Sequence, residues 1–173
     1  MITKNTPLHE VMEHAQPCTC HACEHGCQHG SGALTKEDVK KLAKFLGMDE
    51  EQLKEKYLEE VEKFNTRLYR PKVLRRKGKP FGRCMFFDEE KKCTIHDAKP
   101  TECKVSMGCG DKGEKLSLWF TLNHFVNEND PESVRQYATY LRSEGKTLPG
   151  GELHELVKDK EKLKKILSYE ILR

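Results

Sequence analysis

The sequence predicts a mainly α-helical fold: a small metal-centred α domain with a short β-hairpin and irregular cysteine-bearing loops. Apolar residues recur at helical spacing in several stretches that begin at capping residues and end at glycine or proline. Eight cysteines fall into two well-separated groups, and their spacing is irregular. The chain has 173 residues, which is the size of one domain.

The first cysteine group is too dense for disulfides between neighbours, because one to three intervening residues cannot set the geometry of an unstrained bond. Its members are Cys18, Cys20, Cys23 and Cys27. The second group consists of Cys84, Cys93, Cys103 and Cys109. Thiolates converging on metal suit this pattern, so all eight cysteines are predicted metal ligands. Each group can form a site of its own, or the groups can mix; we favour mixing, because a shared site staples the two segments together.

The N-terminal residues show no apolar signal segment, and no stretch is long enough to span a bilayer. We therefore expect a cytoplasmic protein with no membrane contact. A reducing compartment keeps thiols free, which disfavours the alternative of a secreted disulfide framework. Residues 1–17 are predicted to be a flexible N-terminal leader. A single metal-binding domain is predicted over 18–173, with a cysteine-cluster core at 18–109 and a helical C-terminal part at 116–173.

Two helices are predicted after the first cysteine group. Thr35 and Asp38 form a capping-box pattern, and Gly47 is a natural stop for the first helix. Asp49 is predicted to cap a second helix that ends before Pro71. The apolar stripe of this second helix comprises Leu53, Tyr57, Val61, Phe64 and Leu68.

A β-hairpin is predicted around the charged turn 88–92. The segments 81–87 and 93–95 flank this turn and carry Cys84 and Cys93, which the hairpin would place near each other.

The C-terminal part is predicted to be helical. Residues 116–120 fit either a strand or the start of a helix. Asp130 and Pro131 open a clear helix, which Gly145 ends. A charged helix follows Pro149, and its apolar face is expected to dock on the domain or to form a homodimer with a second copy.

Between Arg67 and Lys79 the chain carries basic residues and no acid. We favour a solvated loop here, ahead of charge compensation for thiolates and of nucleic-acid contact. Tyr69 is the one aromatic residue in this segment, and the net charge of the chain is only +3. Nucleic acid is therefore not the expected partner, whereas a protein or redox partner is.

The histidines are weaker ligand candidates than the cysteines. His96 lies three residues after Cys93 and is the strongest of them, as a ligand or as a support for one. His21, His25 and His29 recur every four residues, so in a helix they would share one face. We expect these three at the rim of the site or exposed to solvent.

Glycines interleave with the cysteines. Gly26, Gly30 and Gly32 are expected to let backbone N–H groups approach sulfur or a bound anion, rather than to form a linker. Cys109 lies between two glycines and is a weak candidate for a reactive thiol. No nucleophile–base arrangement is recognisable, so no catalytic residue is predicted.

Several motifs occur together in one order: the first cysteine group, then the segments 34–39, 82–87, 93–96 and 99–103. On these residues the chain resembles the YkgJ-type cysteine-cluster family of zinc- or iron-chelating proteins, which is related to the flagellin lysine methylase FliB. The likeness covers residues 18–109. It implies metal binding, a [4Fe–4S] cluster as one form of the metal, and a link to protein modification.

The sequence departs from this family's pattern at three places. The family often has an adjacent cysteine pair in its first motif, and none of the cysteines here are adjacent. His96 stands where tyrosine is common, and Lys99 stands where arginine is common.

Soft thiolates select zinc, copper(I) or iron–sulfur clusters. Structural zinc sites usually show two Cys-x2-Cys pairs, and this chain has one, Cys20 with Cys23. Irregular spacing favours a cluster, because several metal atoms offer several ligand sites. We therefore predict an intracellular metal-binding protein that holds a [4Fe–4S] cluster, as an iron–sulfur oxidoreductase in electron transfer or as an accessory to a modifying enzyme.

Two alternatives belong to other classes. One is a zinc-binding structural or interaction module, which differs from the first reading because zinc has no redox activity. The other is a protein lysine methyltransferase of the FliB type, which the lack of a visible nucleotide- or methyl-donor-binding fingerprint disfavours.

Overall fold

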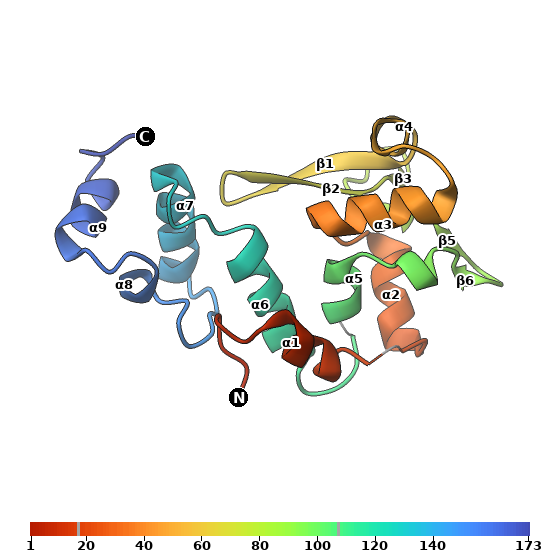
Figure 1. The fold of residues 1–173 in the computed structure, drawn as a ribbon, viewed down its shortest axis with the longest axis horizontal. Coiled ribbons are helices and arrows are strands. Elements are labelled where there is room, and N and C mark those ends of the chain that lie inside the picture. Colours follow the sequence, from red (N-terminus) through yellow and green to blue (C-terminus); the bar gives the residue numbers. More distant parts are fainter. Residues whose placement is uncertain (17, 107) are drawn as a thin grey trace.

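The computed structural model describes residues 1–16, 18–106 and 108–173 (Figure 1). The described helices are α1 (Leu8–His14), α2 (His21–His29), α3 (Lys36–Leu46), α4 (Glu50–Tyr57), α5 (Thr101–Val105), α6 (Gly113–His124), α7 (Pro131–Arg142), α8 (Leu153–Leu156) and α9 (Lys160–Leu167), with a 3-10 turn η1 (His96–Ala98). The strands are β1 (Leu58–Lys63), β2 (Thr66–Pro71), β3 (Val73–Arg75), β4 (Gly82–Cys84), β5 (Phe87–Asp88) and β6 (Lys92–Cys93). They form antiparallel pairs β1–β2, β3–β4 and β5–β6. The mainly helical fold class is confirmed.

Helix α3 begins and ends as predicted. The Thr35 side chain accepts from the backbone of Asp38, and the Asp38 side chain accepts from the backbone of Thr35. Gly47 ends the helix in the left-handed conformation, with φ of 68°. Asp38 also reaches α5, where it accepts hydrogen bonds from the backbone and hydroxyl of Thr101. Asp38, the second member of the capping box, therefore ties α3 to the helix that carries Cys103.

The predicted second helix, from Asp49 to the residue before Pro71, is wrong beyond its first two turns. Helix α4 ends at Tyr57, and the chain continues as the hairpin β1–β2. Phe64 and Asn65 form the turn with φ of 48° and 57°. The chain forms a hairpin here instead of a helix because the hairpin places Glu59 beside Arg70 and packs the Phe64 ring against Tyr137.

The hairpin predicted around residues 88–92 is present, with Phe87 paired to Cys93 across β5 and β6. Asp88 stabilises the turn by accepting from the backbone N–H groups of Glu90 and Lys91. Cys84 lies outside this hairpin, however. It belongs to β4, where it pairs with Val73 of β3.

The basic segment between Arg67 and Lys79 is mostly strand rather than solvated loop. Arg70 and Arg75 both contact the Glu59 carboxylate, over 2.9 and 2.8 Å. Arg67 pairs with Glu62 over 2.7 Å. Three of the seven basic residues in this segment therefore form ion pairs with glutamates of β1.

The N-terminal residues are packed, in contrast to the flexible leader expected over 1–17. Val11 of α1 is fully buried, and Ile2 is 5% exposed. The Trp119 indole N–H donates to the Thr6 carbonyl over 2.8 Å. Trp119 anchors the segment because a buried indole needs an acceptor, and the N-terminal backbone supplies it. Residue 17 itself lies outside the described residues.

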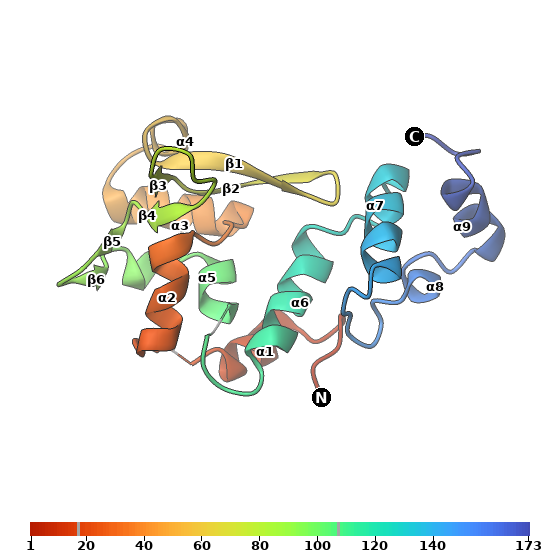
Figure 2. The same cartoon turned by 180° about the vertical axis from the view of Figure 1, so that it is seen from behind.

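In the described part of the chain, apolar side chains form two hydrophobic clusters. One joins α1 to the C-terminal helices α6–α9, and the other joins α3, α4 and the short hairpins. Both views show α6 between α5 and α7, with α1 beneath it (Figures 1 and 2). The cysteines lie on or next to α2, α5 and the hairpins β3–β4 and β5–β6.

The regular elements of the C-terminal part are the helices α6 to α9, which loops connect, and the ambiguous stretch 116–120 belongs to α6. Asp130 caps α7 and Pro131 is its first residue, as predicted. The buried Arg135 guanidinium donates to the carbonyls of Ile166 and Ile171 and holds α9 on α7. Among the described residues, no helix combines the length and apolar character that crossing a bilayer requires.

Candidate metal centre

Four cysteines converge at the N-terminal end of α2. They are Cys18, Cys20, Cys23 and Cys109, and their Sγ atoms all lie within 4.8 Å of one another. We call them the compact cluster. The Sγ atom of Cys109 is 3.4 Å from that of Cys23 and 3.4 Å from that of Cys18. The compact cluster therefore joins both cysteine-bearing segments of the chain.

Local structure places each of these thiols. Cys20 is the N-cap residue of α2, and Cys23 lies in its first turn. Cys109 reaches them because Gly108 packs against the backbone of Ala22, where a Cβ would lie 2.6 Å from the carbonyl carbon. Only glycine permits so close an approach of two backbones.

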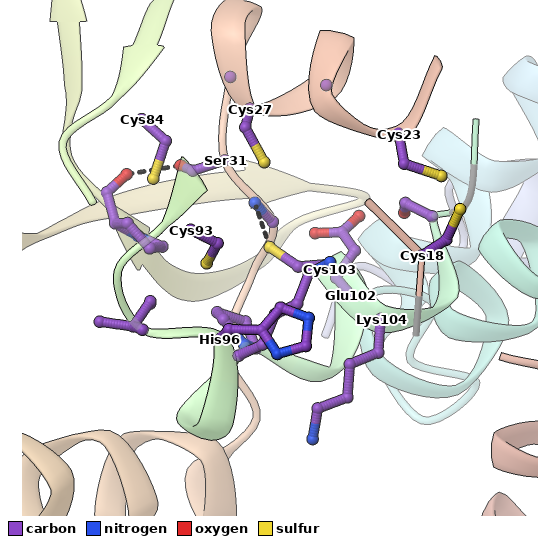
Figure 3. Close-up of a pocket in the computed structure, with 18 of the residues that line it drawn as sticks. Cys18, Cys23, Cys27, Ser31, Cys84, Cys93, His96, Glu102, Cys103 and Lys104 are labelled. Atoms are coloured by element: carbon purple, nitrogen blue, oxygen red, sulfur yellow. Dashed lines mark hydrogen bonds between the residues drawn. The ribbon is translucent and has the colours of Figure 1, made fainter. Parts of the chain in front are cut away.

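The other four cysteines surround a cavity. They are Cys27, Cys84, Cys93 and Cys103, and we call them the wide group. The cavity has a volume of about 570 Å³, and Cys18 and Cys23 of the compact cluster also line it. The sulfur atoms of the wide group point into one shared space (Figure 3). Among the described residues, only the compact cluster has three or more ligand atoms all within 4.8 Å, so the wide group is more open.

The wide group comes from four elements: Cys27 from α2, Cys84 from β4, Cys93 from β6 and Cys103 from α5. The backbone N–H of Gly32 donates to the Cys103 sulfur over 3.2 Å (Figure 3). A Cβ on Gly32 would lie 2.6 Å from that sulfur. This is the close N–H approach to sulfur that the glycine pattern predicted.

The family comparison agrees with this geometry. The sequence model of the family described as "CxxCxxCC: Putative zinc- or iron-chelating domain" matches residues 19–132. The chain belongs to this family. The resemblance inferred from the cysteine motifs is thereby confirmed. In the structure, four grouped cysteines are positioned to bind zinc or iron. No curated protein and no solved structure matches the chain.

The compact cluster of this chelating-family protein fits one tetrahedral ion. A thiolate–zinc bond of 2.3 Å places the sulfurs of a tetrahedral site about 3.8 Å apart. The sulfur separations in the compact cluster, from 3.4 Å to at most 4.8 Å, bracket that value. Thiolates are ligands for zinc and for iron alike, so this spacing fits either ion.

Hydrogen bonding among the compact thiols separates their pKa values. A hydrogen bond from the backbone of Cys23 lowers the pKa of Cys20 to about 7. Hydrogen bonds to Cys18 and Cys23 raise the pKa of Cys109 to about 12. The Cys20 sulfur is thus ready to bind a cation near neutral pH, whereas the Cys109 thiol must release its proton when it binds one.

Burial dominates the chemistry of the wide group. It raises the pKa of Cys84 to about 11 and also raises the pKa values of Cys93 and Cys103. The positive charge of Lys99 acts in the opposite direction on Cys93 and Cys103. Lys99 also lines the cavity. In the sequence, Lys99 stands out only as a departure from the family pattern. Its position beside the thiols results from the folding of the chain.

The histidines divide into three kinds. His96 is exposed and lines the cavity with Cys93 and Cys103, so its part as a ligand stays a prediction (Figure 3). His124 packs on the Phe120 ring, and burial lowers its pKa, which is typical of a structural residue. His21, His25 and His29 share the exposed side of α2.

Proposed function

We propose that this chain is an iron–sulfur protein with two unlike thiolate sites. The wide group binds a [4Fe–4S] cluster that transfers electrons or serves a modifying enzyme. The compact cluster binds one zinc or iron ion and fastens the two cysteine-bearing segments together. The observation that carries the proposal is the difference in sulfur spacing between the two groups.

The spacing matters because the two kinds of metal centre need different geometries. The thiolates of a four-iron cluster bind four different iron atoms, so they stand farther apart than the ligands of one ion. The compact cluster is too tight for this arrangement without movement of its thiols. The wide group surrounds a cavity of about 570 Å³, which leaves space for iron and sulfide between the sulfurs.

Charge and burial around the wide group support a redox centre. The cavity is lined mainly by sulfur and carbon, and Lys99 offsets part of the negative charge that four thiolates would bring. Hydrogen bonds to sulfur, such as that from Gly32 to Cys103, are among the features that tune the potential of such clusters. The exposed His29 and His96 lie on the cavity lining, so the centre is near a surface that a redox partner can reach.

A zinc-stabilised interaction module is the second candidate. The tetrahedral spacing of the compact cluster favours it, because zinc sites of four cysteines have that geometry. In this alternative the wide group holds no cluster, and the function of the chain lies in what its surface binds.

The decisive experiment is anaerobic purification followed by assay of iron, zinc and acid-labile sulfide per chain. Visible absorption is recorded before and after dithionite. Three proteins are compared: the wild type, Cys93→Ser in the wide group and Cys109→Ser in the compact cluster. Circular dichroism confirms that each variant is folded.

We expect sulfide and a bleachable band in the wild type, loss of both in Cys93→Ser, and retention of both in Cys109→Ser with less bound zinc or mononuclear iron. Zinc alone, with no sulfide and no colour, would overturn the iron–sulfur proposal in favour of the zinc module. A band lost in Cys109→Ser and kept in Cys93→Ser would place the cluster at the other group.

A further inference from the structure

The exposed face of α2 carries an imidazole pair beside the thiol cavity. We propose that His25 and His29 form a capture site for a divalent transition-metal ion, Zn²⁺ or Fe²⁺, from which the ion passes to the thiols. The transfer rests on the proposed function, because it needs a thiolate site as the destination; binding at the pair itself does not.

The two rings have the spacing that a chelating pair needs. His29 lies four positions after His25 on one helix, so their side chains lie one above the other. Their ring centroids are 4.2 Å apart and the ring planes are tilted by 35°. Histidines at this spacing on a helix are the first two ligands of many zinc sites. Water can complete the coordination here, which makes the ion exchangeable.

A backbone hydrogen bond prepares His29 for metal. Its Nδ1 atom lies 3.0 Å from the carbonyl oxygen of His25. A carbonyl only accepts, so the bond requires the proton on Nδ1 and leaves the Nε2 lone pair free. Metal-binding histidines are usually oriented in this way, with the second nitrogen donating to an oxygen acceptor.

The position on the helix also favours a cation. His29 is the last residue of α2, and His25 is one turn earlier. The backbone carbonyls at a helix C-terminus carry partial negative charge, which attracts positive ions. Glu24, the acidic neighbour of His25, forms an ion pair with Lys92 over 3.3 Å. The capture site therefore consists of the two imidazoles and does not include this carboxylate.

His29 connects the capture site to the thiols. It lines the same cavity as Cys27, which is two residues earlier on α2. Transfer is a ligand exchange in which the ion stays divalent and no electron moves. The ion leaves two neutral imidazoles and its water ligands for thiolate sulfurs, and each thiol that binds releases its proton to solvent.

The test is the rate at which metal-free, reduced protein takes up Co²⁺, a spectroscopic substitute for zinc and iron. Stopped-flow absorption follows the thiolate-to-cobalt charge-transfer band under anaerobic conditions. The double variant His25→Ala/His29→Ala is compared with the wild type. His9→Ala/His154→Ala is the matched control, since it removes two exposed imidazoles elsewhere.

In the wild type the uptake rate should saturate with Co²⁺ concentration, because a capture complex forms first. At low Co²⁺ the double variant should load roughly tenfold more slowly or worse, the loss typical of removing metal contacts. Its final band should equal that of the wild type, and the control should behave as the wild type does. An unchanged rate in the double variant would overturn the capture site and leave the proposed function intact.

A second measurement separates the two proposals. If the wild type shows no charge-transfer band at any Co²⁺ concentration, the thiolate sites fail and the proposed function with them. Binding at the pair is then judged alone, by NMR of the imidazole protons in metal-loaded protein. Zn²⁺ in excess should shift the signals of His25 and His29 together, and a pair of unshifted signals would contradict the capture site directly.

Discussion

Gly108 lies directly against the backbone carbonyl of Ala22, and this contact brings Cys109 to the thiols at the start of α2. The segments that carry Ala22 and Gly108 are far apart in sequence. Their backbones can come this close only because Gly108 has no side chain. A Cβ on Gly108 would meet backbone atoms, which cannot move aside as the end of a flexible side chain can.

Gly108→Ala should therefore push Cys109 away from Cys23 and weaken metal binding at the compact cluster. We expect a loss of affinity of roughly tenfold or more, as when the surroundings of a metal ligand are disturbed. Competition with a chromophoric chelator for Zn²⁺ measures it.

Gly26→Ala is the matched control for that variant. A Cβ on Gly26 would meet nothing within 4 Å, and the residue lies within α2. Alanine there should leave affinity unchanged and stabilise the helix by about 0.5 to 1 kcal/mol. Equal affinities for the two alanine variants would show that the Gly108 contact does not position Cys109.

The metal-binding character of the site could be predicted from the sequence, because it depends on residue type and local spacing. Cysteines too close for disulfides indicate thiolate ligands wherever the chain later places them. The partition into groups could not be predicted in the same way. Cys109 joins Cys23, while Cys27 lies one turn farther along the same face of α2, beside the other cysteines that line the cavity.

The fold was predictable where local rules decide it and unpredictable where tertiary contacts do. Both ends of α3 follow from Thr35 and Gly47. The β1–β2 hairpin was missed because Val61 and Phe64 also fit a helical stripe, and the acids of β1 pair with arginines of β2 only after the chain turns. The Phe64-Asn65 turn was the available signal, since asparagine tolerates positive φ.

Asp38 is the next test, because this buried carboxylate joins two helices. It accepts from the backbone of Thr35 and from the backbone and hydroxyl of Thr101. Asp38→Ala removes the half of the capping box in which Asp38 accepts from the Thr35 backbone, and it leaves a buried N–H of Thr101 without an acceptor. We expect a loss of about 3 kcal/mol in the free energy of unfolding, measured by urea denaturation.

Asp49→Ala removes the N-cap side chain of another capping box, at the exposed start of α4. Only the cap is lost there, so the expected cost is about 1 kcal/mol. If the two variants lost the same stability, the contact between Asp38 and Thr101 would contribute nothing beyond capping.

The buried thiols make the stability of the metal-free protein depend on alkaline pH. Burial raises the pKa of Cys84 from 9.0 to about 11 in the folded chain. Below pH 9.0 the thiol is neutral in both states, and its contribution to stability is complete. As pH rises from 9.0 towards 11, the unfolded chain ionises first, so the folded state loses stability.

Urea unfolding of reduced, metal-free protein across that range measures this loss. Cys84→Ala removes the ionisable group and should flatten part of the pH dependence, while burial of Cys93 and Cys103 sustains the rest. Stability that is constant or rises with alkaline pH would contradict the burial of these thiols.

Metal removal should loosen one side of the molecule and leave the other intact. The compact cluster fastens Cys18, Cys20 and Cys23 to Cys109, whereas α7 and α9 are held by Arg135 and by their own hydrophobic cluster. Chelation therefore removes a crosslink from the cysteine-bearing side alone. Hydrogen exchange should accelerate in α2 and in the residues around Cys109, with little change in α7. Acceleration of equal size in α7 would mean that metal binding is coupled to folding of the whole chain.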